Sequence, residues 1–212
     1  MLLTETHAWN FAKADALSRI QMERTLGPLD VIRVLQNEKI PFVLVGAYGL
    51  VGWTKRPRAT EDVDVVVPLR QVKKAVRALE EAFPELKGED YEVVARLKNR
   101  QTGHVAIDVM KPIQAPFNAI FKHTHDVTDK GVEYRVPNLE MALATKFAPL
   151  VSLGRAEVDK YSDARDFALM AINNEDFDWI SLESLGESIF PGGGKEIVEK
   201  VRQAKAGQKL VF

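Results

Sequence analysis

Two aspartates separated by one residue stand at the head of an apolar run, Asp62-Val-Asp64-Val-Val-Val. In a strand, alternate side chains share a face, so Asp62 and Asp64 are expected to point the same way while Val63 and Val65 point into the core. Neighbouring carboxylates repel each other unless a cation lies between them. This pair therefore predicts a hard divalent ion that prefers oxygen ligands, Mg²⁺ or Mn²⁺.

A third acid, Asp108, stands inside the apolar stretch HVAIDVM, residues 104–110. The alternation predicts a strand in which Val105, Ile107 and Val109 share one face and Asp108 lies on the other. A carboxylate in such a strand is costly if it is buried and unpaired, so it needs a partner such as an ion. Asp108 is therefore the third candidate metal ligand.

A phosphate-binding turn is predicted upstream of the aspartate pair. Residues 42–45 form a short apolar run that ends at Gly46, and residues 47–53 read as a short helix. The unpaired N–H groups and positive dipole end of that helix can hold phosphate. Arg56 and Arg58 follow in a basic link, and their guanidinium groups match phosphate geometry.

Charged residues also stand in two predicted helices near the C-terminus. In the helix from residue 139 to about 153, Lys146 lies among apolar residues, where it either contacts a ligand or extends from the core to water. In the helix over residues 158–172, Asp163 and Asp166 are one turn apart, and Asp163 is the favoured functional residue of the two.

The remaining pattern predicts an α/β (α+β) fold, a mixed sheet with flanking helices followed by a helical C-terminal part. Ile20 and Tyr161 are expected to face inward, and Gly192–Gly194 is expected to be a linker. We divide the chain into an α/β core over residues 1–137 and a helical part over residues 138–212. The other expected segments are helices over 8–25, 28–38, 69–83, 177–190 and 195–206, strands over 91–97, 125–129 and 132–136, a loop over 84–90, and an irregular segment over 112–121.

Composition limits the class of protein. Among 212 residues, 29 Lys and Arg oppose 30 Asp and Glu, so the net charge of −1 gives no general reason to bind nucleic acid. The chain has no cysteine, which excludes disulfides and thiolate metal sites. No apolar run approaches the roughly 20 residues of a membrane span, and the N-terminus lacks the basic start and apolar core of a signal peptide. We expect a cytoplasmic protein without a membrane partner.

The order of these motifs resembles the nucleotidyltransferase superfamily related to DNA polymerase β, which carries a glycine turn, an Asp-x-Asp pair and a third aspartate. The similarity is greatest to the AbiEii-like toxins and other small prokaryotic nucleotidyltransferases, whose later helices carry L-x-x-x-K and D-x-x-D. Residues 143–146 give a looser version of the first helix motif, and residues 163–166 fit the second. The resemblance covers about residues 29–170.

The resemblance implies a nucleotidyltransferase fold and transfer of a nucleoside monophosphate from an NTP to a hydroxyl acceptor. It implies that Asp62, Asp64 and Asp108 are catalytic and hold two metal ions, and that Asp108 also accepts the proton of the hydroxyl. The expected nucleotide-binding residues are Gly46, Ala47, Arg56, Arg58, Lys146 and Asp163, and Arg56 and Arg58 are the two arginines of the basic link.

Three questions stay open at this stage. The acceptor can be an RNA 3′ end, a protein hydroxyl or a small molecule. Ala47 stands where the family usually has glycine or serine, so the alternative is an inactive nucleotidyltransferase fold that binds a nucleotide or a protein. The resemblance also raises a toxin role, with an antitoxin protein as partner.

Overall fold

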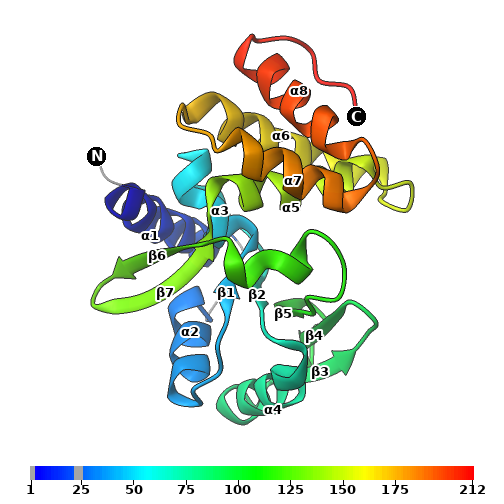
Figure 1. Cartoon of the computed structure of the whole chain (residues 1–212). Coiled ribbons are helices and arrows are strands. Elements are labelled where there is room, and N and C mark those ends of the chain that lie inside the picture. Colours follow the sequence, from blue (N-terminus) through cyan, green and yellow to red (C-terminus); the bar gives the residue numbers. More distant parts are fainter. Residues whose placement is uncertain (1–2, 22–25) are drawn as a thin grey trace.

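The computed structural model describes residues 3–21 and 26–212, and Figure 1 shows their arrangement. Residues 22–25 of the first predicted helix lie outside this description. The helices are α1 (Leu3–Gln21), α2 (Pro28–Asn37), α3 (Gly46–Thr54), α4 (Val72–Ala82), α5 (Leu139–Val151), α6 (Glu157–Asn173), α7 (Trp179–Ile189) and α8 (Gly193–Lys205), with 3₁₀ turns η1 (Leu69–Gln71) and η2 (Phe117–Lys122). The strands are β1 (Val43–Leu44), β2 (Val63–Val66), β3 (Leu86–Asp90), β4 (Val94–Asn99), β5 (Val105–Met110), β6 (Thr124–Asp129) and β7 (Val132–Pro137).

The predicted mixed sheet is confirmed, and within the described residues its strand order is β1-β2-β5-β4-β3. β2 and β5 run parallel, whereas the pairs β1–β2, β5–β4 and β4–β3 are antiparallel. A parallel pair needs a long crossover connection, and α4 together with the β3–β4 hairpin supplies it here. Two strands distant in the sequence therefore lie side by side at the centre of the sheet.

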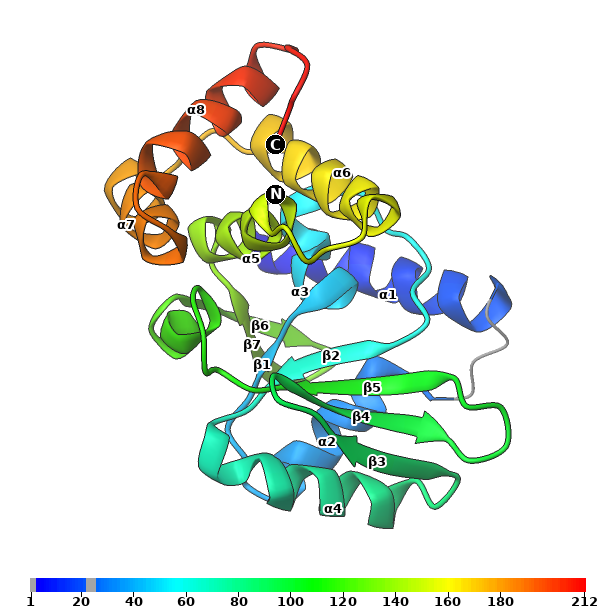
Figure 2. The same ribbon diagram turned by 90° about the vertical axis from the view of Figure 1, so that its right-hand side faces the viewer.

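Different helices cover the two faces of the sheet (Figure 2). α2 and α4 lie on one face, and the fully buried Val63, Val65 and Ile107 belong to the hydrophobic cluster that these helices share with the sheet. α5 to α8 lie on the other side and form a second cluster, to which Val43 and Leu50 also contribute. Since side chains alternate along a strand, the polar residues of β2 and β5 point toward these C-terminal helices.

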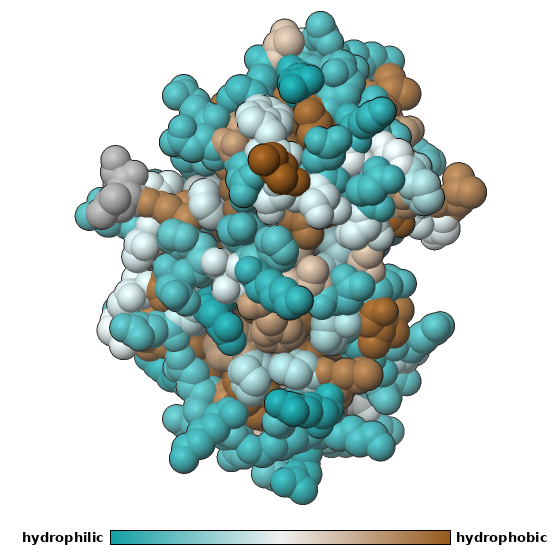
Figure 3. All heavy atoms as spheres, viewed as in Figure 1, coloured by the Kyte–Doolittle hydropathy of each residue, from teal (hydrophilic) through white to brown (hydrophobic). Residues whose placement is uncertain are grey.

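The helical C-terminal part is confirmed. The Asn138 side chain accepts a hydrogen bond from the Met141 N–H at 3.0 Å and so caps α5. Phe147 of α5 and Phe167 of α6 are fully buried, with their ring centroids 6.4 Å apart. No helix in the described ranges is both long and apolar enough to cross a membrane. Hydrophilic residues cover most of the face shown in Figure 3, with hydrophobic residues scattered among them.

The expected loop over residues 84–90 is wrong, because β3 forms there and pairs antiparallel with β4. In its sequence, LKGED, Leu86 is the one buried residue, and the other four are exposed or partly exposed. An edge strand with so little buried surface has no apolar alternation, so hydrophobic periodicity does not reveal it.

The glycine run is the start of a helix rather than a linker. Gly193 and Gly194 are the first two residues of α8 and are buried against α7. A Cβ on Gly193 would lie 2.4 Å from the carbonyl oxygen of Gly186, so small residues let the two helices approach closely. Ile20 and Tyr161 were expected inside, but they are 78% and 76% exposed.

Candidate active site

Three carboxylates meet at the parallel strand pair. Asp62 immediately precedes β2, Asp64 lies within β2, and Asp108 lies within β5 directly beside Asp64 in the parallel register. One carboxylate oxygen from each of the three lies within 4.8 Å of the other two. The alternation of the strands and their register therefore build an acidic cluster that can hold a cation.

Gly46 has no side chain, and the Asp64 carboxylate occupies the space that a Cβ would need. Its φ of +60° lies in the left-handed region, and a Cβ there would fall 1.8 Å from Oδ2 of Asp64. Gly46 also begins α3, whose first three N–H groups, those of Gly46, Ala47 and Tyr48, have no acceptor within the helix. The amino end of α3 and its positive dipole thus lie next to the three acids.

The pKa values of the acids reflect their crowding. Burial raises the pKa of Asp64 well above its usual value, and the charges of Asp62 and Asp108 raise it further. Burial also raises the pKa of Asp108 to about 6, although Arg96 opposes the shift. Oδ1 of Asp108 is buried and makes no hydrogen bond. A cation between these groups would relieve both the repulsion and the unsatisfied oxygen.

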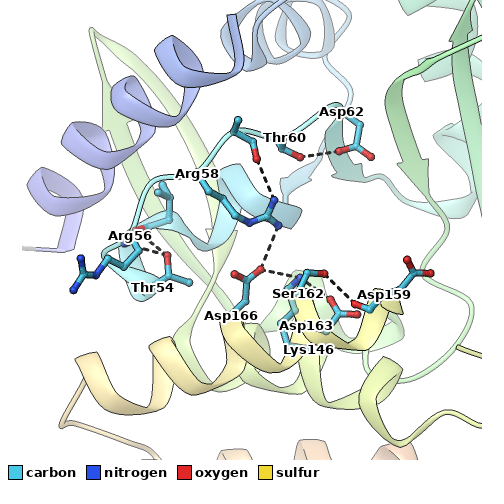
Figure 4. Close-up of polar contacts among 12 residues, drawn as sticks. Thr54, Arg56, Arg58, Thr60, Asp62, Lys146, Asp159, Ser162, Asp163 and Asp166 are labelled. Carbon is cyan, nitrogen blue, oxygen red and sulfur yellow. Dashed lines mark hydrogen bonds and ion pairs between the residues drawn. The ribbon is translucent and has the colours of Figure 1, made fainter. Parts of the chain in front are cut away.

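The N-terminal helix α1 helps to position the first acid. The Thr60 hydroxyl donates to Oδ1 of Asp62 at 3.0 Å (Figure 4). The Thr60 N–H in turn donates to the hydroxyl of Ser18 on α1 at 3.1 Å, and the Tyr48 hydroxyl donates to the same oxygen at 2.9 Å. A chain of hydrogen bonds therefore runs from α1 through Thr60 to Asp62.

The opposite wall carries a buried network of alternating charges (Figure 4). Nζ of Lys146 lies 2.8 Å from Oδ1 of Asp163 and 3.1 Å from Oδ2 of Asp166. Arg155 pairs with Asp163 at 3.2 Å, and Arg58 pairs with Asp166 at 3.4 Å. Burial alone would lower the pKa of Lys146, but Asp166 and Asp163 together raise it. Lys146 therefore stays charged beside the cleft.

A cleft of about 930 Å³ separates the two walls. Arg56 does not line it, because its side chain is exposed and points away from the Lys146 network in Figure 4. The structure brings the other predicted residues together along this cleft, namely Gly46, Ala47, Arg58, Asp62, Asp64, Asp108, Lys146 and Asp163.

Three further residues of the cleft lining were not predicted from the sequence. Thr60 stands two residues before Asp62, and Arg155 lies just before α6 without any motif around it. Arg96 lies opposite Asp108 in the β4–β5 register, with its Nε 3.5 Å from Oδ1 of Asp108. Arg96 lies near the acids because β4 pairs with β5, and no motif in the sequence indicates this pairing.

Comparison with known proteins gives matches in structure alone. No family model and no curated protein sequence matches the chain. The antigenic nucleotidyltransferase-like protein from Paracoccidioides brasiliensis superimposes with a TM-score of 0.52 at 16% identity, over 85% of this chain and 90% of that one. ANT(2")-Ia in complex with adenylyl-2"-tobramycin superimposes with a TM-score of 0.50 at 13% identity, over 84% of this chain and 92% of that one.

At such low sequence identity, the two superpositions establish the fold of the chain and not its activity or substrate. The resemblance to the AbiEii-like group stays a prediction. With its mixed sheet, its flanking helices and its acids at the parallel strand pair, the chain has the fold of nucleotidyltransferase-like proteins.

Proposed function

We propose that this chain is a nucleotidyltransferase that depends on Mg²⁺ or Mn²⁺ and moves a nucleoside monophosphate from an NTP to a hydroxyl acceptor. The observation that carries the proposal is the convergence of Asp62, Asp64 and Asp108 within 4.8 Å, on a fold shared with nucleotidyltransferase-like proteins. The amino end of α3 beside the acids adds a place for phosphate.

The donor set fits a hard divalent cation. All three side chains offer carboxylate oxygens, and the described residues around them offer no histidine. Oδ1 of Asp108 makes no hydrogen bond, and the missing Cβ of Gly46 leaves room for the carboxylate of Asp64. When bound, such ions neutralise phosphate charge and lower the pKa of an attacking hydroxyl.

The residues divide the remaining work. Asp62, Asp64 and Asp108 would hold the cation, and Asp108 would also take the proton of the acceptor hydroxyl. The hydroxyl oxygen then bonds to the α-phosphorus while the bond from that phosphorus to the pyrophosphate oxygen breaks, so pyrophosphate leaves with the electron pair. Catalysis by this arrangement rests on positioning and charge neutralisation.

The other cleft residues bind the nucleotide in this proposal. The N–H groups of Gly46 and Ala47 at the amino end of α3 hold the β- and γ-phosphates. Lys146 and Arg58 supply positive charge from the opposite wall, where Asp163 and Asp166 orient them. We further propose that residues 1–137 provide the catalytic acids and that residues 138–212 form a helical part that closes the cleft.

Pyrophosphate release tests the proposal. The native chain is incubated with Mg²⁺ and each NTP in turn, with total cellular RNA or protein extract as acceptor pool. We expect release with at least one combination and a loss of at least about 100-fold in Asp62→Asn, since the metal ligand set is then incomplete. Glu61→Gln is the matched control, because Glu61 is adjacent, exposed and outside the cleft lining.

Ala47 favours a second candidate, a nucleotide-binding module without turnover, because alanine offers no hydroxyl to phosphate. A folded native chain that binds NTP but releases no pyrophosphate with any acceptor pool would establish this alternative. In that case Ala47→Ser should tighten NTP binding about fivefold, as one added hydrogen bond is worth roughly 1 kcal/mol.

The toxin role is a separate hypothesis that rests on the resemblance alone. Expression in a bacterial host should arrest growth, and Asp64→Asn should relieve the arrest. Harmless expression of the native chain at the same protein level would reject the toxin role and leave the transferase proposal standing.

A further inference from the structure

The acceptor must reach Asp108 from the side of β5 that faces away from β2. In the sheet order β1-β2-β5-β4-β3, the amino end of α3 and the Asp62–Asp64 pair lie on one side of Asp108, and β4 lies on the other. The cleft volume of about 930 Å³ is near the upper end for ligand pockets, so two substrates fit. With the NTP at α3, the β4 side is the acceptor side.

Next to Asp108, the side of the cleft formed by β4 has apolar side chains and one cation. Val93 and Val94 line the cleft there, Met110 pairs with Val94 in the β4–β5 register, and Arg96 is the charged residue among them. Apolar walls with one fixed charge are typical of sites that hold a ring or a sugar and orient it through one ionic contact.

Every carboxylate among the described lining residues belongs either to the acidic cluster or to an ion pair. Asp62, Asp64 and Asp108 form the acidic cluster, and Asp163 pairs with Lys146 and Arg155. No carboxylate among the described lining residues remains to bind an amine on the acceptor. A polycation would instead meet Arg96.

Arg96 is placed to bind an anion beside the reacting hydroxyl. It lies directly opposite Asp108 in the antiparallel register, and its Nε is 3.5 Å from Oδ1 of Asp108. The side chain is 46% exposed, and its guanidinium lies 5.8 Å from the ring centroid of Tyr91. A guanidinium has five N–H donors in a planar fork, so contact with one carboxylate leaves donors that can grip a phosphate bidentately.

We propose that the acceptor carries a phosphate close to its reacting hydroxyl and that Arg96 binds this phosphate. The inference rests on the proposed function, because it assumes that a hydroxyl reacts at Asp108. The bond changes are those of the transfer described above, with the proton going to Asp108 and pyrophosphate leaving. An RNA 3′ end and a small sugar phosphate share this chemistry, whereas a polycationic aminoglycoside lacks it.

Calorimetric binding tests the inference without turnover. The native chain with Mg²⁺ is titrated with a short RNA ending in a 3′ hydroxyl, with ribose 5-phosphate and with tobramycin. We expect one or both phosphorylated probes to bind and tobramycin not to bind. Arg96→Gln should weaken the bound probe at least about tenfold, since a charged hydrogen bond is worth roughly 1.5–3 kcal/mol. Arg96→Lys should recover part of the affinity, because it keeps the charge but loses the fork.

Lys98→Gln is the matched control, because Lys98 lies on the same strand, pairs with Glu89 and does not line the cleft. Binding by RNA alone identifies a polynucleotide acceptor, and binding by ribose 5-phosphate identifies a small one. The inference is overturned if neither phosphorylated probe binds, if tobramycin binds, or if Arg96→Gln binds as well as the native chain. Arg96-dependent binding without pyrophosphate release would reject the proposed catalysis and retain the acceptor class.

Turnover separates binding by Arg96 from an effect through Asp108. With an acceptor found active, Arg96→Gln should raise the acceptor KM and leave the NTP KM unchanged. A fall in kcat alone, equal for every acceptor, would mean that Arg96 acts only on Asp108 and would contradict the proposal.

Discussion

Gly46 and Asp64 share a space that cannot hold one more carbon atom: a Cβ on Gly46 would lie 1.8 Å from Oδ2 of Asp64. The turn that starts α3 and the acid at the centre of the sheet are therefore fitted to each other. Gly46→Ala should move Asp64 as well as strain the backbone, so we expect metal-dependent transfer to fall at least about 100-fold. The measurement is pyrophosphate release, together with Mg²⁺ titration.

Gly103→Ala is the control for backbone strain. Gly103 has a φ of +74°, but a Cβ there would meet nothing within 4 Å. Both variants should lose about 1–2 kcal/mol of unfolding free energy, the cost of a left-handed residue with a side chain, and Gly46→Ala should lose more because its Cβ overlaps Asp64. Equal transfer rates in the two variants would show that the contact with Asp64 is unimportant.

Removing the charge of Asp108 should stabilise the metal-free protein. Its folded-state pKa of about 6 is above the unfolded value of 3.8, so the folded state binds more protons between these pH values. Stability is therefore lost as the pH rises from 3.8 to 6, and the loss is complete above pH 6. At pH 7.5 in EDTA, Asp108→Asn should gain about 1–3 kcal/mol in denaturant unfolding.

With Mg²⁺ in place of EDTA, the native chain should become more stable than Asp108→Asn, because the metal binds the native chain more tightly. Asp126→Asn is the control, because Asp126 is exposed on β6 and does not line the cleft. A native chain that gains nothing from Mg²⁺ would argue against the metal site.

His7 should make the protein sensitive to mild acid. The side chain is buried, both ring nitrogens lack a hydrogen bond, and burial followed by the nearby His125 lowers its pKa to about 4. The unfolded state, with a histidine pKa of 6.5, binds more protons between pH 4 and 6.5. The unfolding free energy should therefore fall as the pH drops through this window, by up to about 3 kcal/mol.

Unfolding in urea at several pH values measures this dependence. His7→Leu should flatten the curve between pH 4 and 6.5, because the apolar side chain binds no proton. His104→Gln should leave it unchanged, since His104 is exposed. An unchanged slope in His7→Leu would assign the acid sensitivity to other groups.

Lys146 should matter for stability as well as for binding. Lys146→Met leaves Asp163 and Asp166 buried with only Arg155 and Arg58 nearby. Removing one partner from a buried charge network typically costs about 3 kcal/mol. Lys160→Met, which breaks a pair with the exposed Glu157, should cost less than about 1 kcal/mol. Thermal and denaturant unfolding of the two variants compares these costs.

The acids could be predicted from the sequence because strand alternation is a local property. Extended backbone places Asp62 and Asp64 on one face, and a lone acid such as Asp108 is conspicuous in an apolar strand. The register that places Asp108 beside Asp64 is not local, since it depends on a crossover that includes α4 and the β3–β4 hairpin.

Residues whose importance comes from non-local pairing could not be predicted. Arg96 is a single basic residue in a strand, and only the β4–β5 register places it opposite Asp108. Ser18 contributes through α1, whose packing against α3 is set by Phe11 and Tyr48 rather than by any motif. β3 escaped notice because an edge strand can be polar on both faces.

Three hydrogen bonds join the carboxyl end of α3 to the carboxyl end of α6. The Asn173 side chain donates to the Thr54 carbonyl at 2.6 Å, the Asn174 side chain donates to the Trp53 carbonyl at 2.9 Å, and Lys55 donates to the Asn173 carbonyl. These bonds join the carboxyl end of α3 to that of α6, the helix that carries Asp163. The two walls of the cleft are therefore joined at one end. In the proposed function, these bonds keep the carboxyl end of α3 attached to α6 while substrates bind between the walls.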